Sequence, residues 1–291
     1  MVDIKELSYV VAGGKDLAAW EKFATQVLGL EVYSRDEQRL YLRADINAYR
    51  VCIERNDSED VIALGWAVSS EADLDAFAAH LKTHGVAAQV GTPEDLVKRR
   101  VLKLLRFQDP NGIVNEVVWG AEIKEQRPFR SPIHMDGFLS GPFNALGHVV
   151  VSADNVHASR VFYRDVLFHK VTTIARLGDF EVDFLRCNRR HHSIAFAESH
   201  RPKRLQHIQL EYQTFDDIGR AMDRAADTQT EIVSPLGRHI GDRVTSFYVR
   251  APSGLVMELA YGARIMDEDA PTEFESFSGS IWGHRYGMEN T

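Results

Sequence analysis

Three residues that could serve one reaction lie close together in the stretch GRHIGDRVTSFYVRAPSGLVMELAYG, which runs from Gly237 to Gly262. They are His239, Tyr248 and Glu258. The sequence Ala-Pro-Ser-Gly at 251–254 predicts a turn between two strands, so Tyr248 and Glu258 are expected on the two arms of one hairpin, facing a common interior. A carboxylate on such an apolar strand costs on the order of several kcal/mol to bury unless a cation or hydrogen bonds satisfy it. The pattern therefore favours a metal ligand beside two groups able to handle protons.

The chain repeats itself. LSYVVAGGKDLAAWEKFATQVLGLEV, starting at Leu7, returns as LGHVVVSADNVHASRVFYRDVLFHKV, starting at Leu146. RFQDPNGIVNEVVWG returns later as YVRAPSGLVMELAYG, which pairs Glu116 with Glu258. Because the offset between the copies stays nearly constant, the two halves are predicted to be one duplicated unit.

The repeat predicts an α+β fold of two similar domains. We expect an N-terminal metal-free domain over residues 1–125, a connector over 126–144, and a catalytic metal-binding domain over 145–275. In each half a short apolar strand precedes an amphipathic helix and several strands, and this order occurs twice. The prediction is four βαβββ modules, two per domain, with each domain forming a partly open, barrel-like mixed sheet that has helices on one face and a cavity on the other. Asp16 and Asn155 are expected to cap the first helix of each half.

Three aligned positions compare the two halves, and they differ at two of them while the third is glutamate in both. The aligned pairs are His148 with Tyr9, His207 with Trp66, and Glu258 with Glu116. Two neutral imidazoles and one carboxylate, with other positions open, are typical of the facial triad of non-haem Fe(II) sites. Each residue alone has an ordinary explanation as a core histidine or a buried ion-pair partner. The three together favour a metal in the C-terminal half and none in the N-terminal half.

Other histidines give less information. His191 and His192 adjoin a strand-like run in CNRRHHSIAF, and neighbouring residues on a strand face opposite ways. We therefore expect only one of the two to face the interior, and the residues alone do not decide which. His284 lies in loop-like sequence near the C-terminus and carries no functional signal.

At almost its full length the chain resembles the type I extradiol ring-cleaving dioxygenases of the vicinal oxygen chelate superfamily. The segments that carry the likeness are LGHVVV, CNRRHHSIAF, HIQLE, the stretch from Gly237 to Glu258, and SIWGH. The resemblance implies the vicinal oxygen chelate fold and assigns roles to particular residues. By this likeness the iron ligands fall on His148, His207 and Glu258, the active-site histidine on His192, other pocket groups on His239, Tyr248 and Asp242, and a wall of the substrate pocket on Phe184. One departure is Phe168, which stands where the family usually has glycine and is expected to affect only a turn.

The resemblance implies extradiol (meta) cleavage of a catechol with insertion of both atoms of O2, in the degradation of aromatic compounds. The likeness is greatest to enzymes that cleave 2,3-dihydroxybiphenyl and related bicyclic catechols. Fe(II) is the implied cofactor, and Mn(II) has similar ligand preferences. His192 is expected to stabilise charge that develops on oxygen and to act as an acid–base group, Tyr248 to hydrogen-bond one catechol oxygen, and His239 to hold the proton of the other.

Four alternatives remain open: an extradiol enzyme for single-ring catechols, one for polycyclic or steroid catechols, a glyoxalase-like metal isomerase, and a metal-free small-molecule binder.

The composition of the chain limits the classes of partner it could bind. Acidic residues outnumber basic ones, 42 to 34, which disfavours nucleic acid and anionic membranes. No apolar run approaches the roughly 18 residues of a membrane span. Two distant cysteines, Cys52 and Cys187, suggest reduced thiols and a cytoplasmic location, and the family likeness implies a homo-oligomer.

Overall fold

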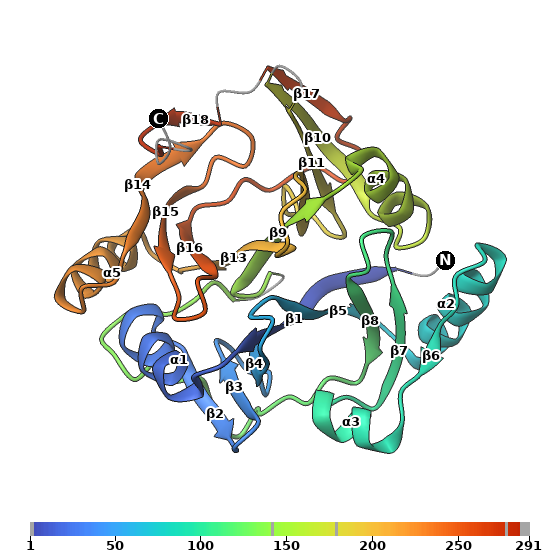
Figure 1. Ribbon diagram of the computed structural model, residues 1–291, viewed down its shortest axis with the longest axis horizontal. Helices are drawn as coiled ribbons and strands as arrows, with labels where there is room; N and C mark the ends of the chain where they lie inside the picture. The colour runs from blue at the N-terminus through green and yellow to red at the C-terminus, as the bar shows by residue number, and fades with distance from the viewer. Residues whose placement is uncertain (1–2, 141–142, 178–179, 277–278, 286–291) are drawn as a thin grey trace.

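The computed structural model describes residues 3–140, 143–177, 180–276 and 279–285 of the 291-residue chain (Figure 1). In the N-terminal half the elements are β1 (Ile4–Gly14), α1 (Leu17–Phe23), the π-helical turn η1 (Ala24–Leu28), β2 (Glu31–Arg35), β3 (Arg39–Arg43), β4 (Val51–Arg55), β5 (Val61–Val68), α2 (Glu71–Thr83), β6 (Gln89–Val90), α3 (Pro93–Arg99), β7 (Lys103–Gln108) and β8 (Val114–Trp119). In the C-terminal half they are β9 (Leu146–Ala153), α4 (Val156–Asp165), β10 (Lys170–Leu177), β11 (Phe180–Arg186), β12 (Ile194–Glu198), β13 (Leu205–Glu211), α5 (Phe215–Asp227), β14 (Ile232–His239), β15 (Thr245–Arg250), β16 (Val256–Tyr261), β17 (Glu273–Ser276) and β18 (Ser280–Trp282).

The strands form two mixed sheets with matching topology. The first has the order β2-β3-β4-β1-β5-β8-β7-β6, and the second has β17-β10-β11-β12-β9-β13-β16-β15-β14-β18. Without β17 and β18, which add one strand to each edge, the second order repeats the first strand for strand. Each half therefore contains two βαβββ units whose first strands pair antiparallel at the centre of the sheet. The predicted α+β fold with mixed sheets is confirmed, and both sheets are open at their edges among the described residues.

Helix starts follow the predicted capping. The side chain of Asp16 accepts hydrogen bonds from Ala18 N and Ala19 N at the start of α1, and that of Asn155 accepts one from Ala158 N at the start of α4. The turn expected after Leu167 is present. Phe168 adopts φ +57° in it, in the left-handed region that favours glycine. Its ring lies 4.3 Å from that of His80 on α2, so this residue also joins the two halves.

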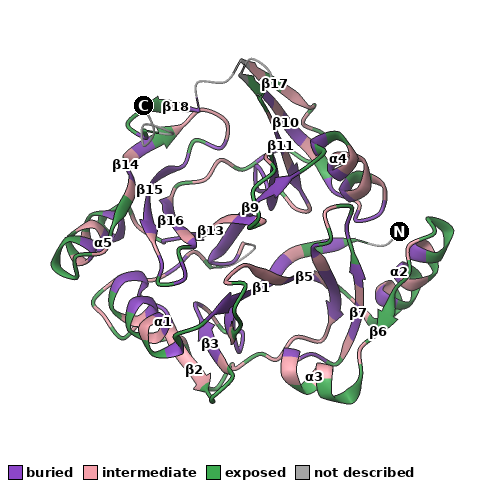
Figure 2. Cartoon of the chain, in the orientation of Figure 1, coloured by how far each residue is buried: buried purple, intermediate pink, exposed green. Residues whose placement is uncertain are grey.

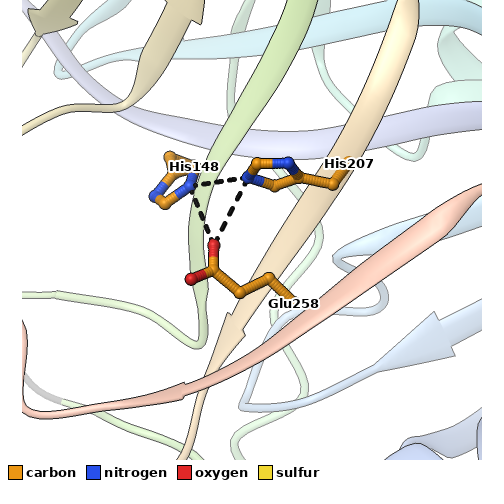
Figure 3. A group of neighbouring side chains, drawn as sticks. All are labelled: His148, His207 and Glu258. Atoms are coloured by element: carbon orange, nitrogen blue, oxygen red, sulfur yellow. Dashed lines mark hydrogen bonds and ion pairs between the residues drawn. The ribbon is translucent and has the colours of Figure 1, made fainter. Parts of the chain in front are cut away.

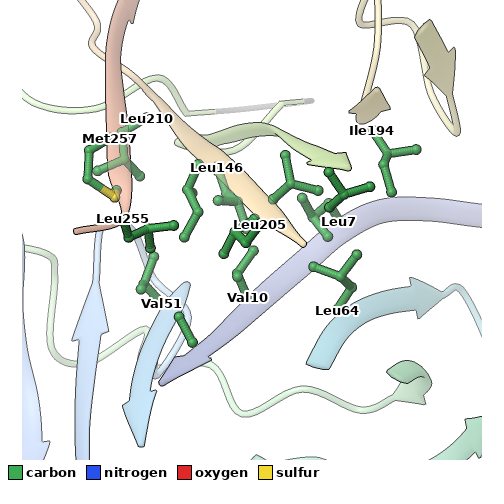
Figure 4. Packing of buried hydrophobic residues seen from close by; sticks show 14 of the residues in the cluster. Leu7, Val10, Val51, Leu64, Leu146, Ile194, Leu205, Leu210, Leu255 and Met257 are labelled. Atoms are coloured by element: carbon green, nitrogen blue, oxygen red, sulfur yellow. The ribbon is translucent and has the colours of Figure 1, made fainter. Parts of the chain in front are cut away.

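One hydrophobic core runs through both halves. Figure 4 shows Leu7, Val10 and Leu64 from the N-terminal half packed against residues of the C-terminal half such as Leu146 and Met257. The helices lie at the periphery with their outer faces exposed (Figure 2). At the junction of the halves α5 packs on the turn that follows α1, and α2 contacts α4, whereas α3 lies away from the junction. None of the helices in the described part of the chain is long and apolar enough to cross a membrane.

The strands alternate between this core and an inner sheet face. On β13 the side chains of Ile208 and Leu210 belong to the core. The alternate residues His207 and Gln209 therefore face the other way. The same alternation holds on β9, where Val149 belongs to the core and its neighbours do not face it. The inner face of the second sheet therefore presents polar groups on its central strands.

Candidate metal centre

Three neighbouring strands bring His148, His207 and Glu258 to one place on the inner face. His148 lies on β9, which pairs antiparallel with β13, and β13 pairs parallel with β16. In the parallel pair, Gln209 is directly opposite Glu258, so the carboxylate stands beside the strand that carries His207. The hairpin predicted from the turn at 251–254 is present.

The three side chains converge on a nearly equilateral triangle (Figure 3). His148 Nε2 lies 3.2 Å from His207 Nε2 and 3.2 Å from Glu258 Oε2, and His207 Nε2 lies 3.3 Å from Glu258 Oε2. Three donors at about 2.1 Å from one first-row divalent ion would be separated by about 3.0 Å in octahedral geometry and about 3.4 Å in tetrahedral geometry. The triangle therefore has the size that such an ion requires, and the donors form a possible metal-binding group.

The charges of the donors also suit a cation. Burial by itself would raise the pKa of Glu258, but the neighbouring imidazoles of His148, His207 and His239 hold it well below its usual value. Burial lowers the pKa of His207 and so favours its neutral form. Glu258 is fully buried, and its Oε1 accepts no hydrogen bond of good geometry from a described residue, although His239 Nε2 lies 3.4 Å away. A buried, ionised oxygen of this kind is stabilised by a cation beside it.

His192 lies directly beside the triad. Its ring centroid is 3.8 Å from that of His148. The expectation that only one of His191 and His192 faces the interior is wrong, because both imidazoles are buried and their Nδ1 atoms are 3.0 Å apart. The physical reason is that β12 begins only at Ile194, so the alternation of a strand does not apply to the two histidines.

His239 and Tyr248 face the carboxylate from the other side. Tyr248 is directly opposite Glu258 across the β15–β16 pair, and its hydroxyl lies 2.8 Å from His239 Nε2. Burial disfavours a charged His239, but its contact with Glu258 and the nearby Asp242 raise its pKa to about 9. The protonated ring donates from Nδ1 to the carbonyl of Gly279, at 3.1 Å.

Asp242 and Phe184 lie at the border of the same site. Asp242 is buried, and one of its oxygens lies within 4.8 Å of ring nitrogens of His148 and His192, so a second possible donor group shares His148 with the first. Phe184 on β11 is half-buried, and its ring lies 4.9 Å from that of His192. It packs in a small apolar cluster with Val150, Val182, Ala195 and Ala197.

His284 belongs to this site, although its loop-like sequence context carries no functional signal. Its ring lies 4.3 Å from that of His239, its Nε2 is 2.8 Å from the carbonyl of Ser246, and its Nδ1 is 2.8 Å from Ser280 Oγ. The approach needs glycine at position 237, where a Cβ would come within 2.3 Å of the backbone nitrogen of His284. The expectation of no signal at His284 was wrong because β18 returns to β14 across the sheet edge, a pairing that local sequence does not reveal.

The strand register corrects one of the aligned pairs. Val11 pairs with Ala63, and its counterpart Val150 pairs with His207, so the residue equivalent to His207 is Ala63 and not Trp66. An error of three residues, being odd, moves a side chain to the opposite sheet face. Trp66 accordingly points into the main core.

Known proteins resemble the chain over almost its whole length. Residues 145–259 match the Glyoxalase/Bleomycin resistance protein/Dioxygenase superfamily, and residues 7–55 match the family described as Dihydroxybiphenyl dioxygenase BphC D1. The biphenyl-2,3-diol 1,2-dioxygenase of Paraburkholderia xenovorans (strain LB400) is 36% identical, over 98% of this chain and 96% of that protein. An iron-dependent extradiol dioxygenase of Rhodococcus jostii (strain RHA1) is 33% identical over 99% of both chains. The crystal structure of BphC, a halotolerant catechol dioxygenase, superposes with a TM-score of 0.91 at 28% identity, covering 98% of this chain and 95% of that one.

Proposed function

Since the chain belongs to the extradiol dioxygenases of the Glyoxalase/Bleomycin resistance protein/Dioxygenase superfamily, we propose that it is an Fe(II)-dependent enzyme that opens a bicyclic catechol beside its two hydroxyls. The relatives confirm the resemblance to this family that the sequence motifs indicate. The observation that carries the proposal is the triangle of His148, His207 and Glu258 with acid–base groups around it. 2,3-Dihydroxybiphenyl is the proposed substrate, and both atoms of O2 enter the ring-opened product.

The donor set supports a divalent ion with open coordination positions. His148, His207 and Glu258 would hold Fe(II), and Mn(II) shares the same ligand preferences. Iron is the metal in the name of the Rhodococcus relative. When bound, the ion lowers the pKa of the catechol hydroxyls and brings the diol and O2 to one centre. One carboxylate against a divalent cation leaves a single positive charge, which suits a catechol that has lost one proton.

The surrounding residues supply proton and charge control. Tyr248, opposite Glu258, would hydrogen-bond one catechol oxygen, and His239 would hold a proton at the other. His192, stacked beside His148, would donate to the oxygen that gains negative charge and then serve as an acid–base group. Asp242, which lies close to His192, contributes negative charge at the border of the site.

An apolar wall supports an aromatic substrate larger than one ring. Phe184 packs with Val150, Val182, Ala195 and Ala197 on the side of the site that holds His192. Phe184 is only half-buried in this cluster, so its ring would be available to contact a second ring of the substrate. The relative from Paraburkholderia is named for biphenyl-2,3-diol, which is a bicyclic catechol.

The test begins with anaerobic addition of ferrous iron to the metal-free protein, followed by 2,3-dihydroxybiphenyl and air. We expect a yellow product, one O2 consumed per catechol, and a product that contains both oxygen atoms of ¹⁸O2 by mass spectrometry. Parallel reactions with catechol, 3-methylcatechol and 1,2-dihydroxynaphthalene rank single-ring against bicyclic substrates by kcat/KM. Intact catechols throughout, together with tight binding of zinc or nickel and isomerase turnover, would overturn the proposal in favour of a glyoxalase-like enzyme.

Three further properties complete the proposal. We expect two domains, over residues 1–125 and 145–275, a cytoplasmic location, and a homo-oligomeric state. Light scattering coupled to size exclusion gives the number of chains per particle, and limited proteolysis tests whether cleavage concentrates in the connector at 126–144.

A further inference from the structure

Behind His192 lies a hydrogen-bonded chain that has no part in the chemistry assigned so far. His192 Nδ1 is 3.0 Å from His191 Nδ1, and His191 Nε2 is 3.0 Å from the hydroxyl of Thr173. Thr173 lies on β10, and all three side chains are buried. The chain therefore runs from the sheet, through one imidazole, to the imidazole beside the proposed metal ligand His148.

The donor and the acceptor in each of these hydrogen bonds can be assigned, because a buried polar group without a partner is costly. Burial lowers the pKa of His191 to about 4, so this ring is neutral, with one nitrogen donating and the other accepting. The hydroxyl of Thr173 has no other hydrogen-bond partner among the described residues. If Thr173 accepted from His191, its own buried O–H would be unsatisfied, at a cost of about 1–3 kcal/mol. Thr173 therefore donates to His191 Nε2.

The remaining protons are then determined one by one. With Nε2 accepting, His191 carries its proton on Nδ1 and donates it to His192 Nδ1. A neutral His192 that accepts at Nδ1 carries its own proton on Nε2. The nitrogen of His192 that does not contact His191 is consequently a donor.

We propose that Thr173 and His191 are positioning residues that hold His192 in its Nε2–H tautomer. This inference rests on the proposed function, in which His192 donates to an oxygen that gains negative charge. A donor that is already oriented in the resting enzyme needs no rearrangement when that charge develops. In the opposite tautomer the same nitrogen would present a lone pair and repel the charge.

The decisive pair of variants removes the hydroxyl in one case and keeps it in the other. Thr173→Val keeps the shape of the side chain and removes the donor, whereas Thr173→Ser keeps the donor. In the iron-loaded enzyme we expect Thr173→Val to lower kcat by about 10-fold, as for other partners that orient a site residue, with unchanged KM and iron content. Thr173→Ser should stay within about 2-fold of the natural chain. Thr172→Val is the matched control, because the neighbouring Thr172 has a buried hydroxyl without a hydrogen-bond partner among the described residues.

A second measurement does not depend on turnover. Solid-state ¹⁵N NMR of the metal-free chain, labelled at histidine and assigned with His192→Gln, reports which nitrogen of His192 is protonated. We expect Nε2–H in the natural chain and in Thr173→Ser, and a mixture of tautomers in Thr173→Val. A proton on Nδ1 in the natural chain would overturn the inference even if catechol cleavage is observed. If instead the tautomer is as expected and no catechol is cleaved, only the proposed function fails.

Discussion

Two glutamates at equivalent positions of the repeat, Glu116 and Glu258, have opposite surroundings. Both are fully buried on the last strand of their second βαβββ unit. Glu116 accepts hydrogen bonds from Tyr9 Oη at 2.6 Å, from Arg99 Nε at 2.7 Å and from Arg106 Nη2 at 2.7 Å. Glu258 instead faces imidazoles. The comparison teaches that a carboxylate at this position needs a positive partner, and that arginine supplies it in one half where a metal would supply it in the other.

The cation of the N-terminal half comes from a local change in the chain path. In that half the chain leaves the sheet after the short β6 and forms α3, whose last residue is Arg99. In the C-terminal half the same segment continues as the longer β14, whose last residue is His239. Both terminal residues reach their glutamate, Arg99 at 2.7 Å and His239 at 3.4 Å. A guanidinium at this point fills the space in which an ion could otherwise contact Glu116.

The largest difference between the two halves is expected for substitutions of His148 and of its counterpart Tyr9. His148→Ala removes one of three donors, so we expect the chain to lose both stoichiometric iron and measurable O2 uptake with 2,3-dihydroxybiphenyl. Iron content after anaerobic loading and desalting gives the first quantity, and an oxygen electrode gives the second. Tyr9→Phe, at the equivalent position of the other half, should keep one iron per chain and full turnover. Retention of both iron and activity by His148→Ala would disprove the ligand assignment.

Glu116→Gln tests the N-terminal half through stability. Loss of the carboxylate leaves the buried Arg99 and the partly buried Arg106 without this partner, so we expect the free energy of unfolding to fall by about 3 kcal/mol. Urea unfolding of the metal-free chain measures the change. Glu258→Gln is the matched control and should cost less in the metal-free chain, because one imidazolium, that of His239, loses its partner there, whereas two guanidiniums lose theirs at Glu116. The reverse order of the two losses would contradict the comparison.

His284→Gln tests how the C-terminal half holds His239, the residue that contacts Glu258 as Arg99 contacts Glu116. The ring of His284 packs on His239 and is fixed by Ser246 and Ser280, so its loss should let His239 move. We expect kcat to fall by about 10-fold with unchanged iron content, in line with other groups that orient site residues. Steady-state kinetics with iron analysis measures both. Trp282→Ala, a change at a half-exposed side chain of β18 two residues before His284, should have little effect, and equal losses in the two variants would assign the effect to the segment of β18 and His284 as a whole.

The smallest expected effect comes from transplanting the histidines. Tyr9→His combined with Ala63→His rebuilds the donor types beside Glu116, yet we expect no second ion, because Arg99 already occupies the carboxylate. Adding Arg99→Ala should allow a second, weakly bound zinc ion, which is counted by elemental analysis after thermal unfolding has shown that the variant folds. A second ion in the double variant would mean that Arg99 does not block the site. A folded triple variant with one ion would mean that the two halves are not equivalent there.

Patterns of residues predicted the fold and the metal group because both depend on regular spacing. The duplicated segments predicted two similar α+β units, and the two sheets have matching strand order; the alternation along β13 and β16 predicted that His207 and Glu258 face the same interior. A period of two residues is fixed by the backbone of any strand, so a correct strand assignment is enough to place such side chains.

Two predictions were wrong because the residues concerned do not follow such a regular pattern. Trp66 is aligned with His207 by the letters of the sequence, but the pairing of β1 with β5 and of β9 with β13 makes Ala63 the counterpart of His207. The pairing of distant strands depends on the length of chain between them, which differs between the two halves, and an alignment of letters does not contain that pairing. His191 and His192 were given the alternation of a strand that starts only after them.

The sequence by itself determined that the chain is a duplicated α+β protein, that its two glutamates are equivalent, and that only one has histidines available to it. The tertiary structure decided what surrounds each glutamate: α3 brings Arg99 to Glu116, and the returning β18 brings His284 to the ring of His239. The physical reason is that local spacing fixes the face on which a side chain stands. Contacts between segments far apart in the chain depend instead on strand register, loop path and packing, which are settled only when the whole core forms.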